Sequence, residues 1–165
     1  GGGLGNYMAY GDFPMTASRG SDDPGDLFLP LGIILNKELG TVHPVDQTQI
    51  AESVTRSWYE YGDNGGPKHP WDGETKPNYT GPQPPYEWLD TEQKYSWVKA
   101  PRYQEKAMEV GPLARMLVAY SSGHERVQHW VNTALTALDV PAEALFSTLG
   151  RIAARGLETA VLAER

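Results

Sequence analysis

Residues 127–138, VQHWVNTALTAL, and residues 145–161, LFSTLGRIAARGLETAV, decide the fold of this chain. In both stretches apolar side chains recur every three or four positions, which is the spacing of one face of an α-helix. Asp139-Val140-Pro141 lies between them and favours a tight turn. The pattern therefore predicts two helices that pack as antiparallel neighbours.

A shorter helix is predicted just before these two. Gly111-Pro112 opens it, with proline in the first turn, where its missing N–H removes no helical hydrogen bond. Gly123 is a suitable residue for ending it. Its apolar positions share one face: Leu113, Leu117 and Tyr120.

Two glycines interrupt the last predicted helix, Gly150 and Gly156. Each costs about 1 kcal/mol relative to alanine inside a helix. A glycine at such a position indicates that another backbone approaches closely. We therefore expect this helix to be buried in something larger.

The front of the chain is dominated by glycine and proline, with 14 of the 18 Gly and 10 of the 13 Pro before residue 86. Residues 27–35, LFLPLGIIL, and residues 41–45 predict a β-hairpin, which is expected to lie at a sheet edge or to be irregular because of Pro30 and Pro44. Further along, the pattern predicts a helix, an irregular loop and a strand: residues 47–61 after an Asp46 cap, residues 62–85, and residues 94–100 before Pro101.

Together these elements predict an α+β fold that is mainly helical. Its irregular Pro/Gly-rich front carries the β-hairpin, and packed antiparallel helices follow. Residues 1–103 form the loop, hairpin and aromatic region, and residues 104–165 form the helical region. The chain length of 165 residues is that of one domain.

Composition excludes several classes of function. The net charge of -7 and the pI near 5.0 leave no basic surplus for phosphates, so nucleic acid is not expected as a partner. The longest apolar run, residues 27–35, is far shorter than the roughly 20 residues that a membrane-spanning helix needs. The chain has no cysteine, so it forms no disulfide and offers no thiolate to a metal.

The histidines do not follow the spacing of a metal site: His43, His69, His124 and His129. Aromatic residues crowd into one region: Trp58, Tyr59, Tyr61, Trp71, Tyr79, Tyr86, Trp88, Tyr95, Trp97 and Tyr103. Packing of the long loop onto a core explains such a cluster, and a platform for sugars or an interface with another protein is the alternative.

Two charged residues flank the start of the first predicted helix. Glu109 lies just before it, where the helix dipole favours a negative charge, and Arg115 lies one turn inside. Arg115 is expected to form an ion pair with Glu109 or with another carboxylate. Neither residue belongs to a recognisable catalytic or metal-binding pattern. No catalytic or metal-binding residue is predicted elsewhere in the chain.

Residues 95–103, YSWVKAPRY, and residues 108–115, MEVGPLAR, resemble the central motif of nickel-iron hydrogenase large subunits of the membrane-bound uptake type. Further segments are similar to the family in the same order: residues 10–14, Leu29-Pro30 with Gly32, residues 43–46, residues 57–59, residues 69–73 with Thr75 and Pro77, and residues 147–151. The resemblance thus extends over nearly the whole chain.

The resemblance implies that the chain is an internal part of a larger large-subunit fold. It implies reversible oxidation of H2 to protons and electrons, which leave through a small subunit with iron-sulfur clusters. The family holds nickel and iron with two Cys-x-x-Cys pairs, and neither pair occurs here, so the Ni-Fe ligands are expected outside this chain. The family type also implies the periplasmic face of the membrane.

On this interpretation the chain carries no catalytic and no metal-binding residue and is inactive alone. Glu109 and Arg115 are expected to support the metal centre from outside its ligand shell. His69 and Trp71 are expected to contact neighbouring protein, either the small subunit or the remainder of the large subunit.

Two other hypotheses stay open at this point: a complete non-catalytic binding module whose aromatic loop is a platform for carbohydrate, and a relative that lost its metals. The first five residues and the last helix look cut, which favours the fragment.

Overall fold

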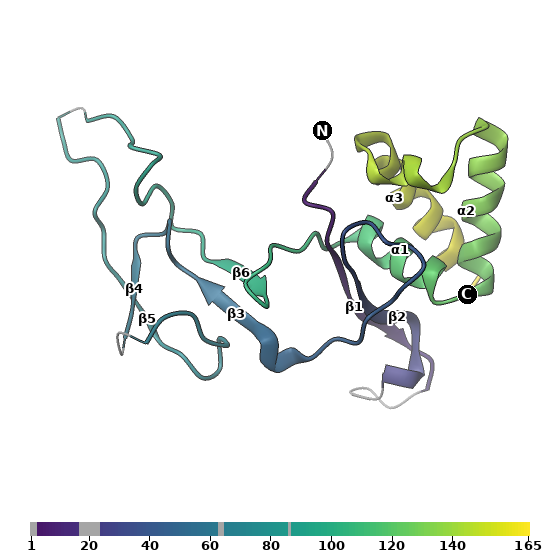
Figure 1. Ribbon diagram of the computed structural model, residues 1–165, viewed down its shortest axis with the longest axis horizontal. Helices are drawn as coiled ribbons and strands as arrows, with labels where there is room; N and C mark the ends of the chain where they lie inside the picture. Colours follow the sequence, from purple (N-terminus) through teal and green to yellow (C-terminus); the bar gives the residue numbers. More distant parts are fainter. Residues whose placement is uncertain (1–2, 17–23, 63–64, 86) are drawn as a thin grey trace. The chain divides into compact units, whose positions relative to one another are not determined.

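The computed structural model describes residues 3–16, 24–62, 65–85 and 87–165 (Figure 1). Within these residues the elements are, in chain order, β1 Tyr7–Pro14, η1 Pro24–Asp26, β2 Leu27–Ile34, η2 Gln47–Gln49, β3 Ile50–Ser53, β4 Tyr59–Tyr61, β5 Thr75–Pro77, β6 Ala100–Tyr103, α1 Pro112–Ser121, α2 Glu125–Leu138, η3 Ala142–Phe146 and α3 Thr148–Ala163. The fold is α+β, as predicted, with a front of strands and loops and a helical back. Among all the described residues, no helix is both long and apolar enough to cross a bilayer.

The chain divides into two compact units. Gly1–Val45 and Met108–Arg165 form the first unit, and Asp46–Ala107 forms the second. The front hairpin therefore belongs with the helices, although the second unit separates them in sequence.

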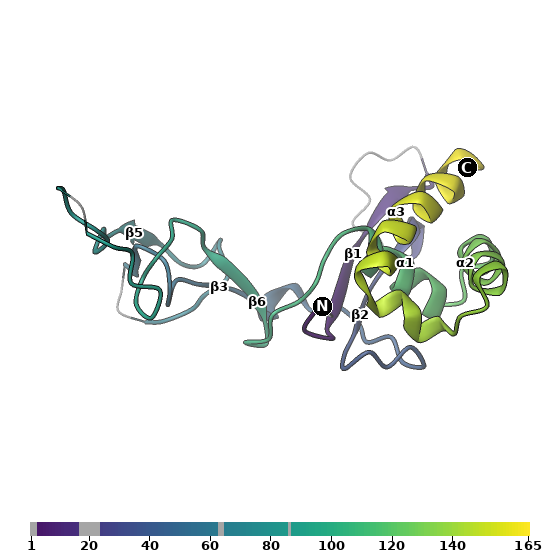
Figure 2. The same ribbon diagram turned by 90° about the horizontal axis from the view of Figure 1, so that it is seen from above.

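The first unit is built around α1. This helix contacts both strands of the hairpin on one side and both other helices on the other (Figures 1 and 2). Six of its ten residues are buried, which is the pattern of a helix enclosed by other elements rather than lying on a surface. The fully buried side chains around it come from all layers of the unit: Tyr7, Leu29, Ile34, Val127, Val131 and Val161.

The predicted hairpin has a different partner strand. β2 pairs antiparallel with β1, from Tyr7 opposite Ile34 to Pro14 opposite Leu27. Residues 41–45, the predicted partner, contribute a single bridge, in which His43 and Ile33 exchange two backbone hydrogen bonds of 2.8 and 2.9 Å. Pairing with β1 prevails because its Tyr7 and Ala9 join the core under α1.

All three helices that the periodicity predicted are present. Pro112 is the first residue of α1, and Gly123 follows its end with a φ of +82°, as expected of a glycine after a helix. Ser147 caps α3, because its side chain accepts a hydrogen bond from the Gly150 amide. The turn before α3 is longer than predicted, since it contains η3.

The second unit contains no long helix within its described residues, so the predicted helix over residues 47–61 is wrong. Asp46 does cap the chain there by accepting a bond from the Thr48 amide, but the helical turn ends at Gln49. β3 then pairs with β6, whose Pro101 lies opposite Glu52. The four-residue spacing of Ile50, Val54 and Trp58 had suggested a helix, and tertiary pairing overrides it.

The predicted strand over residues 94–100 is also wrong, since β6 begins at Ala100 and runs through Pro101 to Tyr103. A two-stranded sheet leaves one edge of each strand unpaired, so a proline can lie in β6 without removing a ladder hydrogen bond. The described residues between 62 and 85 are mostly irregular, as predicted, apart from β5, which pairs with β4.

Gly150 meets the expectation that a backbone approaches α3 closely. A Cβ at this position would lie 2.1 Å from the carbonyl oxygen of Leu145, which belongs to η3. The approaching backbone is thus the chain's own. Gly156 differs, because a Cβ there would meet nothing within 4 Å.

Replacing Gly150 with alanine is expected to lower the free energy of unfolding by about 2 kcal/mol, because the backbone of η3 must move to admit the methyl group. Thermal unfolding of the protein measures the effect. Gly40→Ala is the control, since a Cβ at Gly40 meets no atom within 4 Å. Equal midpoints for the two variants would contradict the close approach at Gly150.

Candidate functional site

The backbone of Glu109 forms two hydrogen bonds with the segment that contains β1. Its amide donates to the Asn6 carbonyl at 2.8 Å, and its carbonyl accepts from the Met8 amide at 2.9 Å. These two bonds form a parallel bridge opposite Tyr7. The residue before α1 is therefore an extension of the hairpin.

The Glu109 carboxylate forms an ion pair with Arg151 of α3. Arg151 Nε donates to Oε1 and Nη2 donates to Oε2, both at 2.6 Å. Both side chains are largely buried, with about a quarter or less of their surface exposed. Two parallel bonds between a guanidinium and a carboxylate fix orientation as well as distance.

Arg115 forms the second ion pair, also with α3. Its Nε donates to Glu158 Oε1 at 2.5 Å and its Nη2 donates to Glu158 Oε2 at 2.9 Å. Glu158 is one of the two buried polar residues among those the structure describes. The predicted ion pair of Arg115 is thus confirmed with another carboxylate, and Glu109 is not its partner.

The two pairs have opposite polarity. The segment at the start of α1 supplies one acid and one base, and α3 supplies the complementary base and acid, Arg151 and Glu158, seven residues apart. Seven residues are about two helical turns, so both side chains leave the same face of α3. The arrangement fixes the register between the two segments, because sliding α3 would bring like charges together.

Hydrogen bonding to the carboxylates raises the pKa of both guanidinium groups, Arg115 through Glu158 and Arg151 through Glu109. Each charge is matched by its partner within the unit. The four residues are consequently suited to holding structure rather than to binding an anion or transferring a proton.

Tyr7 lies fully buried beside the first pair, and its hydroxyl has no hydrogen-bond partner among the described residues. Burial raises the pKa of this phenol above its ordinary value, the negative charge of Glu109 adds to the effect, and Arg151 opposes it. The folded state therefore holds the phenolic proton more tightly than the unfolded chain does.

Because the folded pKa of Tyr7 is raised, the stability that the neutral phenol contributes is complete below about pH 10 and is lost as the pH rises above it. Tyr7→Phe is expected to leave stability at neutral pH unchanged or slightly higher and to reduce the loss above about pH 10. Thermal midpoints of both proteins across this range test it. Parallel curves for wild type and variant would contradict it.

His69 and Trp71 lie in the second unit and take no part in the ion pairs. The His69 Nδ1 accepts from the Trp71 amide at 3.2 Å, and the two rings meet edge to face with centroids 6.0 Å apart. Trp71 is 91% exposed, and Trp88 is 96% exposed. Such large exposed apolar side chains are typical of residues that contact other protein.

Four members of the aromatic region pack on one another. Trp58 contacts Tyr79 and Trp97 edge to face, at ring centroid distances of 4.8 and 5.3 Å, and Trp97 stacks on Tyr79 and meets Tyr59 edge to face. Packing of the loop is thus observed for these rings, and Tyr79 and Trp97 keep 44% and 46% of their surface exposed. Tyr86 lies outside the described residues.

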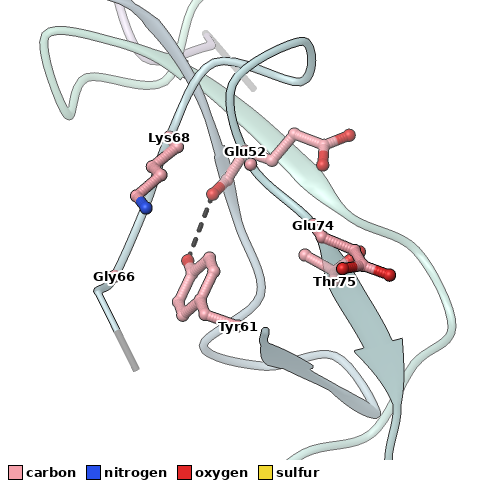
Figure 3. Close-up of a pocket in the computed structure, with 7 residues that line it drawn as sticks. Glu52, Tyr61, Gly66, Lys68, Glu74 and Thr75 are labelled. Atoms are coloured by element: carbon pink, nitrogen blue, oxygen red, sulfur yellow. Dashed lines mark hydrogen bonds between the residues drawn. The ribbon is translucent and has the colours of Figure 1, made fainter. Parts of the chain in front are cut away.

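A small pocket in the second unit lies beside Tyr61, whose hydroxyl donates to the Glu52 carbonyl at 3.1 Å (Figure 3). Lys68, Glu74 and Thr75 also line it. The pocket encloses about 10 Å³, roughly the space that one water molecule needs, so it does not admit an organic substrate.

The other three histidines each make a local contact. His43 bridges β2 through its backbone, His124 caps α2 by accepting from the Val127 amide, and His129 lies next to Trp130. No cluster of three or more His, Asp or Glu side chains suited to a metal occurs in the described part of the chain. Nickel and iron bound by soft ligands require thiolates, and the sequence contains none, so these residues do not fit a nickel-iron centre.

Comparison with solved structures gives the class of protein first. The chain matches the Ni-Fe-Se hydrogenase from D. vulgaris Hildenborough in its as-isolated oxidized state, with a TM-score of 0.65, 28% identity and coverage of 96% of this chain and 30% of that one. The fold is therefore one found within hydrogenases. Sequence comparison then identifies the family: the model described as nickel-dependent hydrogenase matches residues 1–165, and the chain belongs to this family.

Curated relatives agree with this assignment. The uptake hydrogenase large subunit of Rhizobium leguminosarum bv. viciae is 47% identical over 170 residues, covering 96% of this chain and 28% of the relative. The Hydrogenase-1 large chain of Escherichia coli is 38% identical over 159 residues, covering 92% of this chain and 26% of the relative. The chain thus spans little more than a quarter of the length of these relatives. The resemblance to hydrogenase large subunits is confirmed.

Sequence analysis found Glu109 and Arg115 but missed the residues that partner them. Arg151 and Glu158 carry a detectable signal, because they lie about two turns apart on one helix with charges opposite to those of Glu109 and Arg115. Tyr7 carries none, since nothing local to residues 7–14 shows that its ring is buried beside an ion pair. Its position depends on the strand pairing.

Proposed function

We propose that this chain is a supporting segment of the large subunit of a nickel-iron hydrogenase of the uptake type, which oxidises H2 reversibly to protons and electrons. The observation that carries the proposal is the match over the whole chain to the nickel-dependent hydrogenase family, with 47% identity to an uptake hydrogenase large subunit. Electrons would pass to a small subunit with iron-sulfur clusters. The complex would lie at the periplasmic face of the membrane.

The nickel-iron centre would supply the hydrogen chemistry from segments outside these 165 residues, because no thiolate is available here. What this chain contributes is a rigid frame. The pairs Glu109–Arg151 and Arg115–Glu158 bind the hairpin extension and α1 to α3. A frame of this kind holds neighbouring metal-bearing segments in a fixed geometry.

Glu109 and Arg115 would act on the centre only through this positioning, and the exposed Trp71 with His69 would contact neighbouring protein. A structure of the complete heterodimer tests both assignments. Distances of more than about 10 Å from all four residues to the metals and to the small subunit would reject them, since effects usually decouple beyond that range.

Two experiments test the function itself. The coding DNA on either side should contain one in-frame Cys-x-x-Cys pair upstream and one downstream. The complete large subunit, produced with its small subunit, should reduce an electron-accepting dye with H2, and the 165 residues alone should not. Stop codons in place of the cysteine pairs would reject the proposal and favour a relative without metals.

A further inference from the structure

A second pocket of the second unit has a volume of about 320 Å³. It lies beside the paired strands β3 and β6 and the turn that follows β3, and its lining comes from three stretches of chain, within residues 53–57, 95–98 and 100–102. Pockets that hold small molecules usually measure roughly 300–1,000 Å³. The space is thus sufficient for a small organic molecule or for a side chain of another segment.

Two arginines line this pocket, Arg56 and Arg102, and neither forms an ion pair with a carboxylate of the described residues. Arg56 Nη1 donates to the carbonyls of Glu92 and Gln93. Arg102 Nη1 donates to the carbonyl of Pro101 at 2.9 Å. A guanidinium group has five N–H donors, and these contacts use a single nitrogen of each group. Most of the donors therefore remain for a ligand.

The positive charge of the pocket is not balanced within its lining. No acidic side chain of the described residues lines it, and Glu52, which precedes the lining residue Ser53, forms its ion pair with Lys99. Arginine stays charged at every ordinary pH, so the two groups repel each other. The net charge of the chain is -7, so a general excess of basic residues does not explain their meeting. An anion bound in the pocket would offset the repulsion.

Hydroxyl groups supply further polar lining. Ser53 and Thr55 share a hydrogen bond of 3.3 Å, and Ser96 Oγ accepts from the Val98 amide at 2.9 Å. Because the bond at Ser96 uses only its oxygen, the hydroxyl proton remains available for donation. The pocket therefore combines positive charge with hydrogen-bond donors, which together favour an anionic ligand.

We infer that this pocket binds a carboxylate group. A guanidinium group is planar and donates two parallel hydrogen bonds that match the two oxygens of a carboxylate. Val98 and Ala100 add an apolar part to the lining, which suits the hydrocarbon portion of an organic acid and has no counterpart in phosphate or sulfate. The carboxylate belongs either to a small organic acid or to an Asp or Glu side chain of adjoining protein. The inference goes beyond the proposed function, because it requires no oxidation of H2.

Arginine modification in the complete heterodimer tests the first source. Phenylglyoxal, which reacts with accessible guanidinium groups, is added in sodium chloride or in sodium malonate at equal ionic strength, and mass spectrometry quantifies each peptide. A ligand at ten times its dissociation constant leaves about one site in eleven empty. If a small organic acid is the ligand, malonate slows the modification of Arg56 and Arg102 about tenfold. Arg155 is the control, an exposed arginine without a described carboxylate partner, and its rate should not change.

The second source is tested in the same complex with Arg102→Lys, which places an amine in the pocket. A carbodiimide joins an amine to a carboxylate that it contacts, and mass spectrometry of the joined peptides identifies the acidic residue. If an Asp or Glu side chain fills the pocket, malonate leaves the modification rates unchanged and Arg102→Lys gives a new cross-link to that residue. Arg155→Lys is the matched control and should give no cross-link to the same residue.

Arg56→Lys repeats the cross-linking from the other arginine, which is the more exposed of the two, so the test does not depend on one variant folding. A cross-link from either position, or protection by malonate that exceeds its effect on Arg155, supports the inference and identifies the source. The inference is overturned when neither variant gives a cross-link beyond the control and malonate protects neither Arg56 nor Arg102 more than it protects Arg155.

Discussion

Replacing Arg115 with methionine is expected to lower the stability of α1 by about 3 kcal/mol, because it leaves the Glu158 carboxylate buried without its partner. Glu158 is 8% exposed and receives both of its described hydrogen bonds from Arg115. Methionine keeps much of the apolar stem, so the loss reports the charge and the hydrogen bonds rather than packing. Hydrogen exchange of the α1 and α3 amides in the complete protein measures it as a local opening free energy.

A double variant separates the pair from its surroundings. Arg115→Met combined with Glu158→Leu removes both charges, and most of the lost stability is expected to return, because no unpaired charge remains. The matched control is Glu164→Gln in the partly exposed pair Arg126–Glu164, whose atoms are 3.8 Å apart. Its effect is expected to stay below about 1 kcal/mol. If Arg115→Met costs no more than this control, the pair does not hold α1 to α3.

Replacing Lys94 with methionine is expected to cost the second unit about 3 kcal/mol. Lys94 Nζ donates to the carbonyls of Val54, Ser57 and Tyr59, at 3.1, 2.7 and 2.5 Å. A hydrogen bond from a charged donor contributes about 1.5–3 kcal/mol, and water recovers part of this when the donor is lost. A single side chain therefore stabilises a turn that the hydrogen bonds between strands do not hold in place.

The loss of Lys94 should appear locally. Amides of residues 57–59 are expected to exchange faster in Lys94→Met, whereas those of α1 stay unchanged, since they belong to the other unit. Lys99→Met is the control, because Lys99 forms a part-exposed ion pair with Glu52 at 3.3 Å and lies 5.2 Å from the centroid of the Tyr59 ring, so it contacts the same turn without the bonds to the three carbonyls. An effect of Lys94→Met equal to that of the control would show that the three carbonyls do not depend on the ammonium group.

Local patterns predicted the helical half of the fold correctly. The three/four spacing places α2 and α3, and Pro112 marks the first residue of α1, because a proline there removes no helical hydrogen bond. The motifs around residues 95–115 also identified the family, which the comparisons confirm. Both signals are contained in short stretches of sequence, so no knowledge of distant contacts is needed to detect them.

The same local patterns failed in the second unit. Ile50, Val54 and Trp58 have helical spacing, yet β3 pairs with β6 some fifty residues away. Lys94, expected in a strand, instead bonds three carbonyls of a turn about forty residues earlier. Glycine and proline leave this region little intrinsic preference, so long-range hydrogen bonds and ring packing decide its conformation.

By itself, then, the sequence determined the three helices of the first unit, the α+β class, the family and the absence of thiolate ligands for nickel. Only the tertiary structure decided that β1 pairs with β2, that Glu109 and Arg115 each pair with α3, and that a Cβ at Gly156 would meet no described atom within 4 Å outside its own stretch of helix. The reason is that helix periodicity and motif identity are properties of neighbouring residues. Which residue pairs with a buried charge, and which segment packs on a helix face, depends on parts of the chain that come into contact only when it folds.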